Sequence, residues 1–159
     1  MTGYESCNRK LNDRMMDHID HALGRPVMPL KESSRNYFAV DTESDLAAEF
    51  SANPWWKMLG QQGCMSFFGV TEAGRHALTE HLRETGDRWR VFELTFGEHS
   101  RLISERSAAK ARYAWWLDIS YCCPDLTFFD FCRKTRIRTV GEVKPPSRDE
   151  QMLAKPSER

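Results

Sequence analysis

The sequence lacks any long apolar run. No stretch of this 159-residue chain approaches the roughly 20 consecutive apolar residues that a membrane-spanning helix requires. The first seven residues also have neither the basic region nor the apolar region of a secretion signal. These absences exclude a membrane-spanning helix and lead us to expect a protein of the cytoplasm.

Net charge is absent too, because 23 Lys and Arg residues balance 23 Asp and Glu residues. The balance is uneven along the chain: residues 1–86 hold 9 basic against 12 acidic side chains, and residues 87–159 hold 14 against 11. A protein that binds DNA mainly by neutralising phosphates carries a larger positive excess. An acidic imitation of DNA needs a larger negative excess. Charge alone leaves the class of partner open.

Catalytic and metal-binding motifs are also missing. The sequence has no Gly-x-Ser-x-Gly, no His-Glu-x-x-His and no glycine-rich phosphate loop. His18 and His21 stand three residues apart, but a metal site normally needs further ligands at suitable spacing. The five cysteines form no Cys-x-x-Cys pattern, so we expect reduced thiols. We therefore predict no catalytic residue, no metal site, no cofactor and no enzymatic activity. A Cys–His nucleophile pair formed only in the folded chain is the catalytic alternative left open.

The first module is predicted to span residues 1–86 and to begin with helical segments. An apolar residue at every fourth position predicts a helix over residues 11–23. Residues 36–40 form either a short strand or an aromatic anchor on the surface. A second helix is expected to start with Leu46, after several possible capping residues.

The most informative segment of this module follows Pro54. We expect a third helix with Trp55 and Trp56 in its first turn, ended by Gly60 and Gly63. Residues 67–70 suit a buried strand, and Thr71 caps the helix that follows. This order of helix, strand and capped helix resembles the back half of a winged-helix domain.

The second module is predicted to span residues 87–144 with the order β-β-α-α-β. Its expected elements are a hairpin over 89–104, helices over 108–121 and 128–131, and a strand over 136–143. Residues 145–159 are polar and contain proline, so we expect a disordered tail. The predicted fold is α+β, with a winged-helix-like N-terminal module packed on the smaller C-terminal module.

Several segments carry a resemblance to known proteins. The sequences His-Ala-Leu-Gly-Arg-Pro at 21–26, Arg-Asn-Tyr-Phe at 35–38 and Val-Thr-Glu-Ala-Gly-Arg-His-Ala-Leu at 70–78 resemble small accessory proteins of phages and prophages. Residues 107–120 and 124–131 are similar to phage accessory proteins as well. The resemblance implies a mobile element that acts on host machinery in the host cytoplasm. Inhibitors of host defence, anti-CRISPR proteins among them, belong to this kind of protein.

The densest basic segment is residues 133–138, with four cations in six positions. If this segment is a strand, Arg136 and Arg138 project from one face while Ile137 packs inward. Such a face could follow a phosphate backbone, or its charge could protect an edge strand against aggregation. The main functional hypothesis is a non-enzymatic inhibitor that binds a host protein or ribonucleoprotein defence complex. The alternative, in which the basic face contacts phosphates, is a small winged-helix DNA-binding regulator.

The tryptophan pairs at 55–56 and 115–116 complete the candidate site. Consecutive helical residues point about 100° apart, so one ring of each pair lies away from the core centre. That ring either packs the modules together or binds a partner, and interfaces favour Trp, Tyr and Arg. The candidate binding residues are Arg35, Tyr37, Phe38, Trp56, Trp116, Arg133, Lys134, Arg136 and Arg138. The sequence leaves the oligomeric state open.

Overall fold

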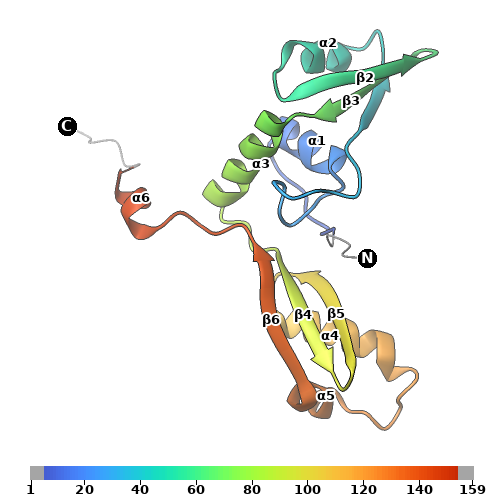
Figure 1. Cartoon of the computed structure of the whole chain (residues 1–159), viewed down its shortest axis with the longest axis vertical. Coiled ribbons are helices and arrows are strands. Elements are labelled where there is room, and N and C mark those ends of the chain that lie inside the picture. The colour runs from blue at the N-terminus through green and yellow to red at the C-terminus, as the bar shows by residue number, and fades with distance from the viewer. Residues whose placement is uncertain (1–5, 154–159) are drawn as a thin grey trace.

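The computed structural model describes residues 6–153, which form two α+β modules arranged end to end (Figure 1). These residues contain six helices and two antiparallel three-stranded sheets, so the predicted α+β class is confirmed. The N-terminal module contains α1 (Arg14–Ala22), β1 (Phe38–Asp41), α2 (Asp45–Ala52), β2 (Trp56–Gln62), β3 (Met65–Val70) and α3 (Glu72–Glu84). The C-terminal module contains β4 (Arg90–Phe96), β5 (His99–Glu105), α4 (Ala108–Ser120), α5 (Phe128–Lys134) and β6 (Thr135–Glu142).

The sheet of the N-terminal module has the strand order β1-β3-β2. Its register pairs Phe38 with Phe68 and Trp56 with Val70, which brings four apolar side chains to one face. Phe50 of α2 lies on that face, stacks on Trp56 with ring centroids 3.9 Å apart and meets Phe38 edge-on at 5.5 Å. The core of this module is therefore an aromatic cluster between the sheet and the first two helices.

The prediction of a helix after Pro54 is wrong, because residues 56–62 form strand β2. Trp56 is the only buried residue of this strand. The sequence therefore has no alternation of apolar and polar residues from which the strand could be predicted. Gly63 does not end a helix but sits in the two-residue turn between β2 and β3, with a φ of +60° that favours glycine. The module consequently has no recognition helix at this point, and the expected helix–strand–helix order over 54–84 is replaced by strand–strand–helix.

The start of α3 fits closely against the residue before β2. Thr71 caps the helix as predicted, since its side-chain oxygen accepts a hydrogen bond from the Gly74 nitrogen. A Cβ at Gly74 would lie 2.7 Å from the backbone oxygen of Trp55 and 2.7 Å from the Cγ1 of Val70. Only glycine permits this approach, which fixes α3 against the β2–β3 hairpin.

The C-terminal module follows its predicted order closely. The hairpin β4–β5, the helices capped by Ser107 and Thr127, and the last strand β6 are all present. The strand order β5-β4-β6 makes β6 an edge strand. Trp115 of α4 and Phe131 of α5 pack on one face of this sheet, with ring centroids 5.7 Å apart.

The two modules meet around the segment that precedes α1. Cys7 and Val27 from the first module form a buried apolar cluster with Val91 of β4. Burial in this cluster raises the pKa of the Cys7 thiol to about 11, so the thiol stays protonated. The thiol donates a hydrogen bond to the Arg25 backbone oxygen at 3.3 Å. Cys7 is thus a packed, unreactive side chain at the junction.

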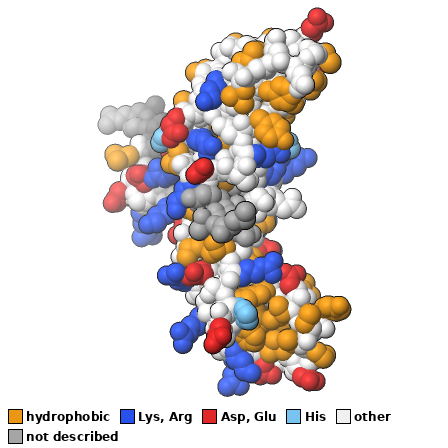
Figure 2. Space-filling model, turned by 45° about the vertical axis from the view of Figure 1, so that its right-hand side comes forward, with side chains coloured by type: hydrophobic (Ala, Val, Ile, Leu, Met, Phe, Trp, Pro, Cys, Tyr) orange, Lys and Arg blue, Asp and Glu red, His pale blue; other side chains and the backbone are white. Residues whose placement is uncertain are grey.

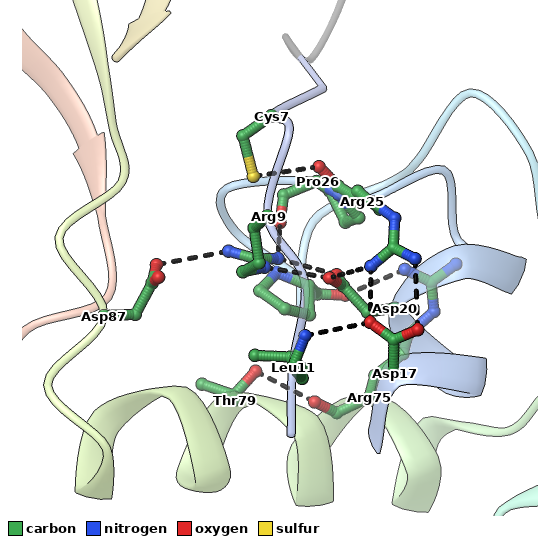
Figure 3. Close-up of polar contacts among 11 residues, drawn as sticks. Cys7, Arg9, Leu11, Asp17, Asp20, Arg25, Pro26, Arg75, Thr79 and Asp87 are labelled. Atoms are coloured by element: carbon green, nitrogen blue, oxygen red, sulfur yellow. Dashed lines mark hydrogen bonds and ion pairs between the residues drawn. The ribbon is translucent and has the colours of Figure 1, made fainter. Parts of the chain in front are cut away.

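A buried ionic network crosses the same junction (Figure 3). The Arg9 guanidinium donates to both carboxylate oxygens of Asp20, at 2.9 and 2.6 Å, and to the Pro26 backbone oxygen at 2.6 Å. It also donates to Asp87, the first acidic residue of the C-terminal module, at 3.2 Å. Arg9 and Asp20 are both almost fully buried. Since a buried charge is tolerated only when it is paired, Arg9 ties the two modules together.

Part of the segment predicted to be a disordered tail is helical. Helix α6 spans Arg148–Leu153, and Glu150 reaches Arg83 of α3 at 2.5 Å. No residue of α6 is buried, so this ion pair is its main contact with the rest of the described chain. The remaining residues of the predicted tail, 154–159, lie outside the described part of the chain.

Candidate protein-interaction surface

The predicted binding residues do not form one surface, because they are divided between the two modules. Arg35, Tyr37, Phe38 and Trp56 belong to the N-terminal module, and the remaining five belong to α4, α5 and β6 of the C-terminal module (Figure 1). Each group is therefore described on its own.

Two aromatic residues of the first group are structural. Trp56 is buried and stacks on Phe50, so it is the inward ring of its pair rather than the outward one. Trp56 was predicted to point outward because a helix was expected where the chain forms β2. Phe38 is half-buried between Phe50 and the rings of His18 and His21. These contacts make Phe38 the residue that holds β1 against α1.

Arg35 and Tyr37 form a cation–π pair. The Arg35 guanidinium carbon lies 4.5 Å from the centre of the Tyr37 ring, and its Nη2 donates to the Tyr37 backbone oxygen at 3.2 Å. About half of Tyr37 is exposed. This pair is a small isolated surface feature, separate from the basic segment of the other module.

Trp116 supports the connection between α4 and α5. Its indole Nε1 donates to the Leu126 backbone oxygen at 3.1 Å, and its ring lies against Tyr113 and Phe128. The ring is only partly exposed. Trp116 thus fixes the loop that positions α5.

The basic segment is arranged as predicted from its alternation. Arg136 and Arg138 are exposed on one side of β6, and Ile137 packs inward against the C-terminal core. Arg138 forms an ion pair with Glu93 of the neighbouring strand. That pairing neutralises one of the two exposed arginines of the strand.

The strongest candidate site lies where α5 joins β6. Phe129 is 69% exposed, and the Arg133 guanidinium carbon lies 5.7 Å from the centre of its ring. Lys134 and Arg136 follow directly, and within residues 6–153 none of these three cations has a carboxylate within ion-pair distance. We call these four residues (Phe129, Arg133, Lys134 and Arg136) the α5 anchor.

The junction beneath the α5 anchor is rigid. Thr135, the residue between the helix and the exposed strand arginines, is buried, and its hydroxyl donates to the Phe131 backbone oxygen at 2.6 Å. Phe131 is fully buried and packs on Trp115. Helix α5 is therefore fixed from below while Phe129 and Arg133 remain on its outer side.

Two shallow hollows border the anchor. One, of about 580 Å³, lies between Lys134 and the β4–β5 turn with His99. The other, of about 220 Å³, lies between Arg136 and Glu93 on the sheet surface. Figure 2 shows the lower module with hydrophobic side chains grouped beside Lys and Arg side chains. The surface thus combines a projecting ring, free cations and recesses that another macromolecule could fill.

Phe129 was not predicted as a site residue, although the sequence contains a signal for it. Phe129 and Arg133 are four residues apart in the short aromatic helix, and side chains at that spacing share one face. Phe128 and Phe131 are the residues of that helix that pack inward. The exposed ring could therefore have been identified by assigning the faces of α5.

The described part of the chain offers no metal site and no membrane span. Within residues 6–153, no group of three His, Cys, Asp or Glu side chains is placed to hold a metal ion. Over the same residues, no helix is both long and apolar enough to cross a bilayer.

Comparison of the chain with protein-family models, with curated proteins and with solved structures finds no match. The resemblance to phage accessory proteins therefore stays a prediction from the sequence segments that carry it.

Proposed function

We propose that the chain is a non-enzymatic, phage-encoded accessory protein that inhibits a host defence complex in the host cytoplasm by stoichiometric, anti-CRISPR-like binding. The phage context comes from the sequence resemblance. The observation that supports binding is the α5 anchor, with a largely exposed phenylalanine beside three cations that lack ion-pair partners among residues 6–153.

The chemistry of the α5 anchor favours an acidic protein surface as the partner. Aromatic residues and arginine dominate the binding energy of protein interfaces, because they bury large areas and keep polar handles. A partner with an apolar recess would take the Phe129 ring, and its carboxylates would pair with Arg133 and Lys134. The rigid junction below the anchor limits the entropy that such binding costs.

The winged-helix DNA-binding regulator is a less well supported alternative. The segment expected to supply a recognition helix, residues 54–62, contains strand β2 instead. Three exposed arginines of the second sheet are also neutralised: Arg90 pairs with Glu142, Arg101 with Asp118 and Arg138 with Glu93. Neutralised cations contribute little to phosphate binding.

The cellular test measures phage plating on a CRISPR-proficient host and on an isogenic host without the CRISPR system. Expression of the wild-type chain is expected to raise plating on the proficient host only. Phe129→Ser with Arg133→Glu is expected to abolish this rescue, because the pair loses both the ring and the favourable charge. The matched control is Met58→Ser, since Met58 is 50% exposed on β2 of the other module and should leave rescue intact.

The biochemical test uses the purified CRISPR ribonucleoprotein complex and native mass spectrometry. We expect a complex with a fixed integer ratio, and an affinity at least about tenfold weaker for Arg133→Glu, which is roughly 1.4 kcal/mol. Absence of both rescue and complex formation would refute the proposal. A salt-dependent shift of naked duplex DNA that is lost in Arg133→Glu would favour the DNA-binding alternative instead.

A further inference from the structure

Helix α4 exposes an apolar stripe that the α5 anchor does not include. Tyr113, Leu117 and Tyr121 are 47%, 50% and 89% exposed. They are four residues apart, so they follow one side of the helix and its C-terminal cap. Ala111 and Trp115 are the buried residues of the opposite side. We call the three exposed residues the α4 stripe.

The α4 stripe is comparable in area to the largest apolar patch of a typical monomer, which is often a functional surface. Three large side chains of roughly 200 Å² each, two exposed by about half and Tyr121 by most of its surface, leave about 350–400 Å² of mainly apolar area. Contiguous apolar patches of this size on soluble proteins commonly mark interaction sites. Tyr113 is held in place by Trp116 and Phe128, with ring centroids 5.8 and 5.4 Å away, so the patch is preorganised.

The spacing of the stripe is symmetric about its middle residue. A two-fold interface requires one patch to complement itself, so that a residue on one side of the axis meets its counterpart from the other copy. Tyr113 and Tyr121 lie four residues before and after Leu117. In an antiparallel pair of α4 helices, Leu117 meets Leu117 at the axis and each Tyr113 meets the second copy's Tyr121.

The charge at the ends of α4 fits the same arrangement. Lys110 lies seven residues before Leu117 on the exposed side, and it has no carboxylate within ion-pair distance among the described residues. An antiparallel pairing brings Lys110 to the C-terminal end of the second copy's α4. That end carries a partial negative charge, and the last turn of α4 contains no basic residue of its own. The second copy's lysine would therefore supply the missing cation.

We propose that two copies of this chain associate through the α4 stripe, as an antiparallel two-fold helix pair centred on Leu117. Two stripes face to face bury about 700–800 Å², and flanking residues bring the area near the roughly 1,000 Å² expected of a specific weak interface. Because this area lies at the low end for specific interfaces, we expect association no tighter than the micromolar range. This inference does not depend on the identity of the host partner or on the α5 anchor.

Sedimentation equilibrium of the full chain tests the proposal over loadings from about 1 μM to about 500 μM. The wild type is expected to shift from monomer to dimer across this range. Leu117→Arg places two cations at the axis and should raise the dimer dissociation constant by at least about tenfold. Met58→Arg is the matched control, because Met58 and Leu117 are both 50% exposed, and it should leave association unchanged.

Two further variants test the orientation of the helices. Lys110→Glu should weaken the dimer severalfold, because it sets a negative charge against a helix C-terminus. Leu117→Cys in a Cys64→Ser, Cys122→Ser, Cys123→Ser background should form a disulfide-linked dimer under mild oxidation, whereas Met58→Cys in the same background should not. A chain that stays monomeric at every concentration, or one in which Met58→Arg and Leu117→Arg have equal effects, would overturn the proposal. Loss of phage rescue in Leu117→Arg from a monomeric wild type would show that the host partner covers the stripe, and it would overturn the dimer as well.

Discussion

The two modules contain sheets of the same size and the same antiparallel pairing, yet they use their aromatic residues differently. In the N-terminal module, the rings of Phe38, Phe50, Trp56 and Phe68 contact one another in the core. The C-terminal module also packs rings in its core, among them Trp115 and Phe131, but it exposes Tyr113, Tyr121 and Phe129 in addition. Among the described residues, the first module thus exposes one aromatic ring by about half, that of Tyr37, whereas the second presents three such rings to solvent. Partners are therefore expected on the C-terminal side.

The sharpest test of this contrast compares an inner ring with an outer one. Phe50→Ala should lower the free energy of unfolding by about 4 kcal/mol, because it removes a fully buried ring from an aromatic cluster. Tyr121→Ala should change it by no more than about 0.5 kcal/mol. Urea denaturation followed by circular dichroism measures both values. Equal losses in the two variants would contradict the division into inner and outer aromatics.

A second substitution breaks the connection between the modules. Arg9→Ala should cost about 3 kcal/mol of unfolding free energy, because it leaves Asp20 and Asp87 as buried carboxylates without their main partner. The cost falls at the low end of the usual range because Asp20 keeps Arg25 at 3.3 Å. The control is Arg14→Ala, whose ion pair with Glu49 is exposed and should contribute at most about 1 kcal/mol. If both variants unfold at the same urea concentration as the wild type, the network does not stabilise the junction.

A third substitution tests the packing that sets the hairpin of the N-terminal module against α3. Gly74→Ala should destabilise the protein by about 2 kcal/mol, because the new methyl group would press on the Trp55 backbone and on Val70. Helix propensity alone predicts the opposite sign, since alanine is favoured over glycine inside a helix. Gly60→Ala is the control, because a Cβ there meets no atom within 4 Å. A stabilised Gly74→Ala variant would show that the contact with Trp55 relaxes freely.

The smallest expected effect depends on pH. The Asp17 carboxylate accepts two hydrogen bonds from Arg25, at 2.7 and 3.2 Å, and these hold the pKa of Asp17 below its ordinary value of 3.8. Ionised Asp17 therefore stabilises the fold above about pH 4, and this contribution is lost as the pH falls through the lowered folded pKa. Asp17→Asn should cost about 1 kcal/mol at pH 7, and the cost should shrink as the pH falls below 3.8 towards the lowered folded pKa.

Asp87 supplies the contrasting case for the same titration. Burial raises the pKa of Asp87 despite the nearby Arg9 charge. Its contribution to stability therefore grows as the pH falls, which is opposite in sign to that of Asp17. Unfolding midpoints of the wild type, Asp17→Asn and Asp87→Asn, measured from pH 2 to pH 7, separate the two carboxyl groups. Parallel pH profiles for both variants would contradict these assignments.

Local signals were sufficient to predict most of the C-terminal module. Ser107 and Thr127 announce their helices by capping, and Gly97 marks the hairpin turn. Strand β2 could not be found in the same way. Six of its seven residues are exposed, so neither of its faces shows an apolar period, and pairing with β3 decides its structure. In the sequence alone, a glycine in a hairpin turn cannot be distinguished from a glycine that ends a helix, because only the pairing with β3 separates the two cases.

The candidate site was predicted only in part. The basic strand follows from a period of two residues, which a sequence shows directly. The separation of Trp56 from that strand depends on which module each residue joins, and no local sequence pattern shows this. The Arg9 network is similarly invisible, because its contact with Asp87 spans 78 positions.

The Arg9 network also has a consequence for the order in which the chain folds during synthesis. The guanidinium makes four hydrogen bonds, and three of them, to Asp20 and Pro26, use residues made soon after Arg9 itself. The fourth acceptor, Asp87, leaves the ribosome only after every strand and helix of the first module has been translated. Domains fold from the N-terminus as they emerge. The first module can therefore fold around an Arg9 side chain that already makes three of its four hydrogen bonds. Docking of the newly made second module then supplies the fourth hydrogen-bond acceptor, Asp87.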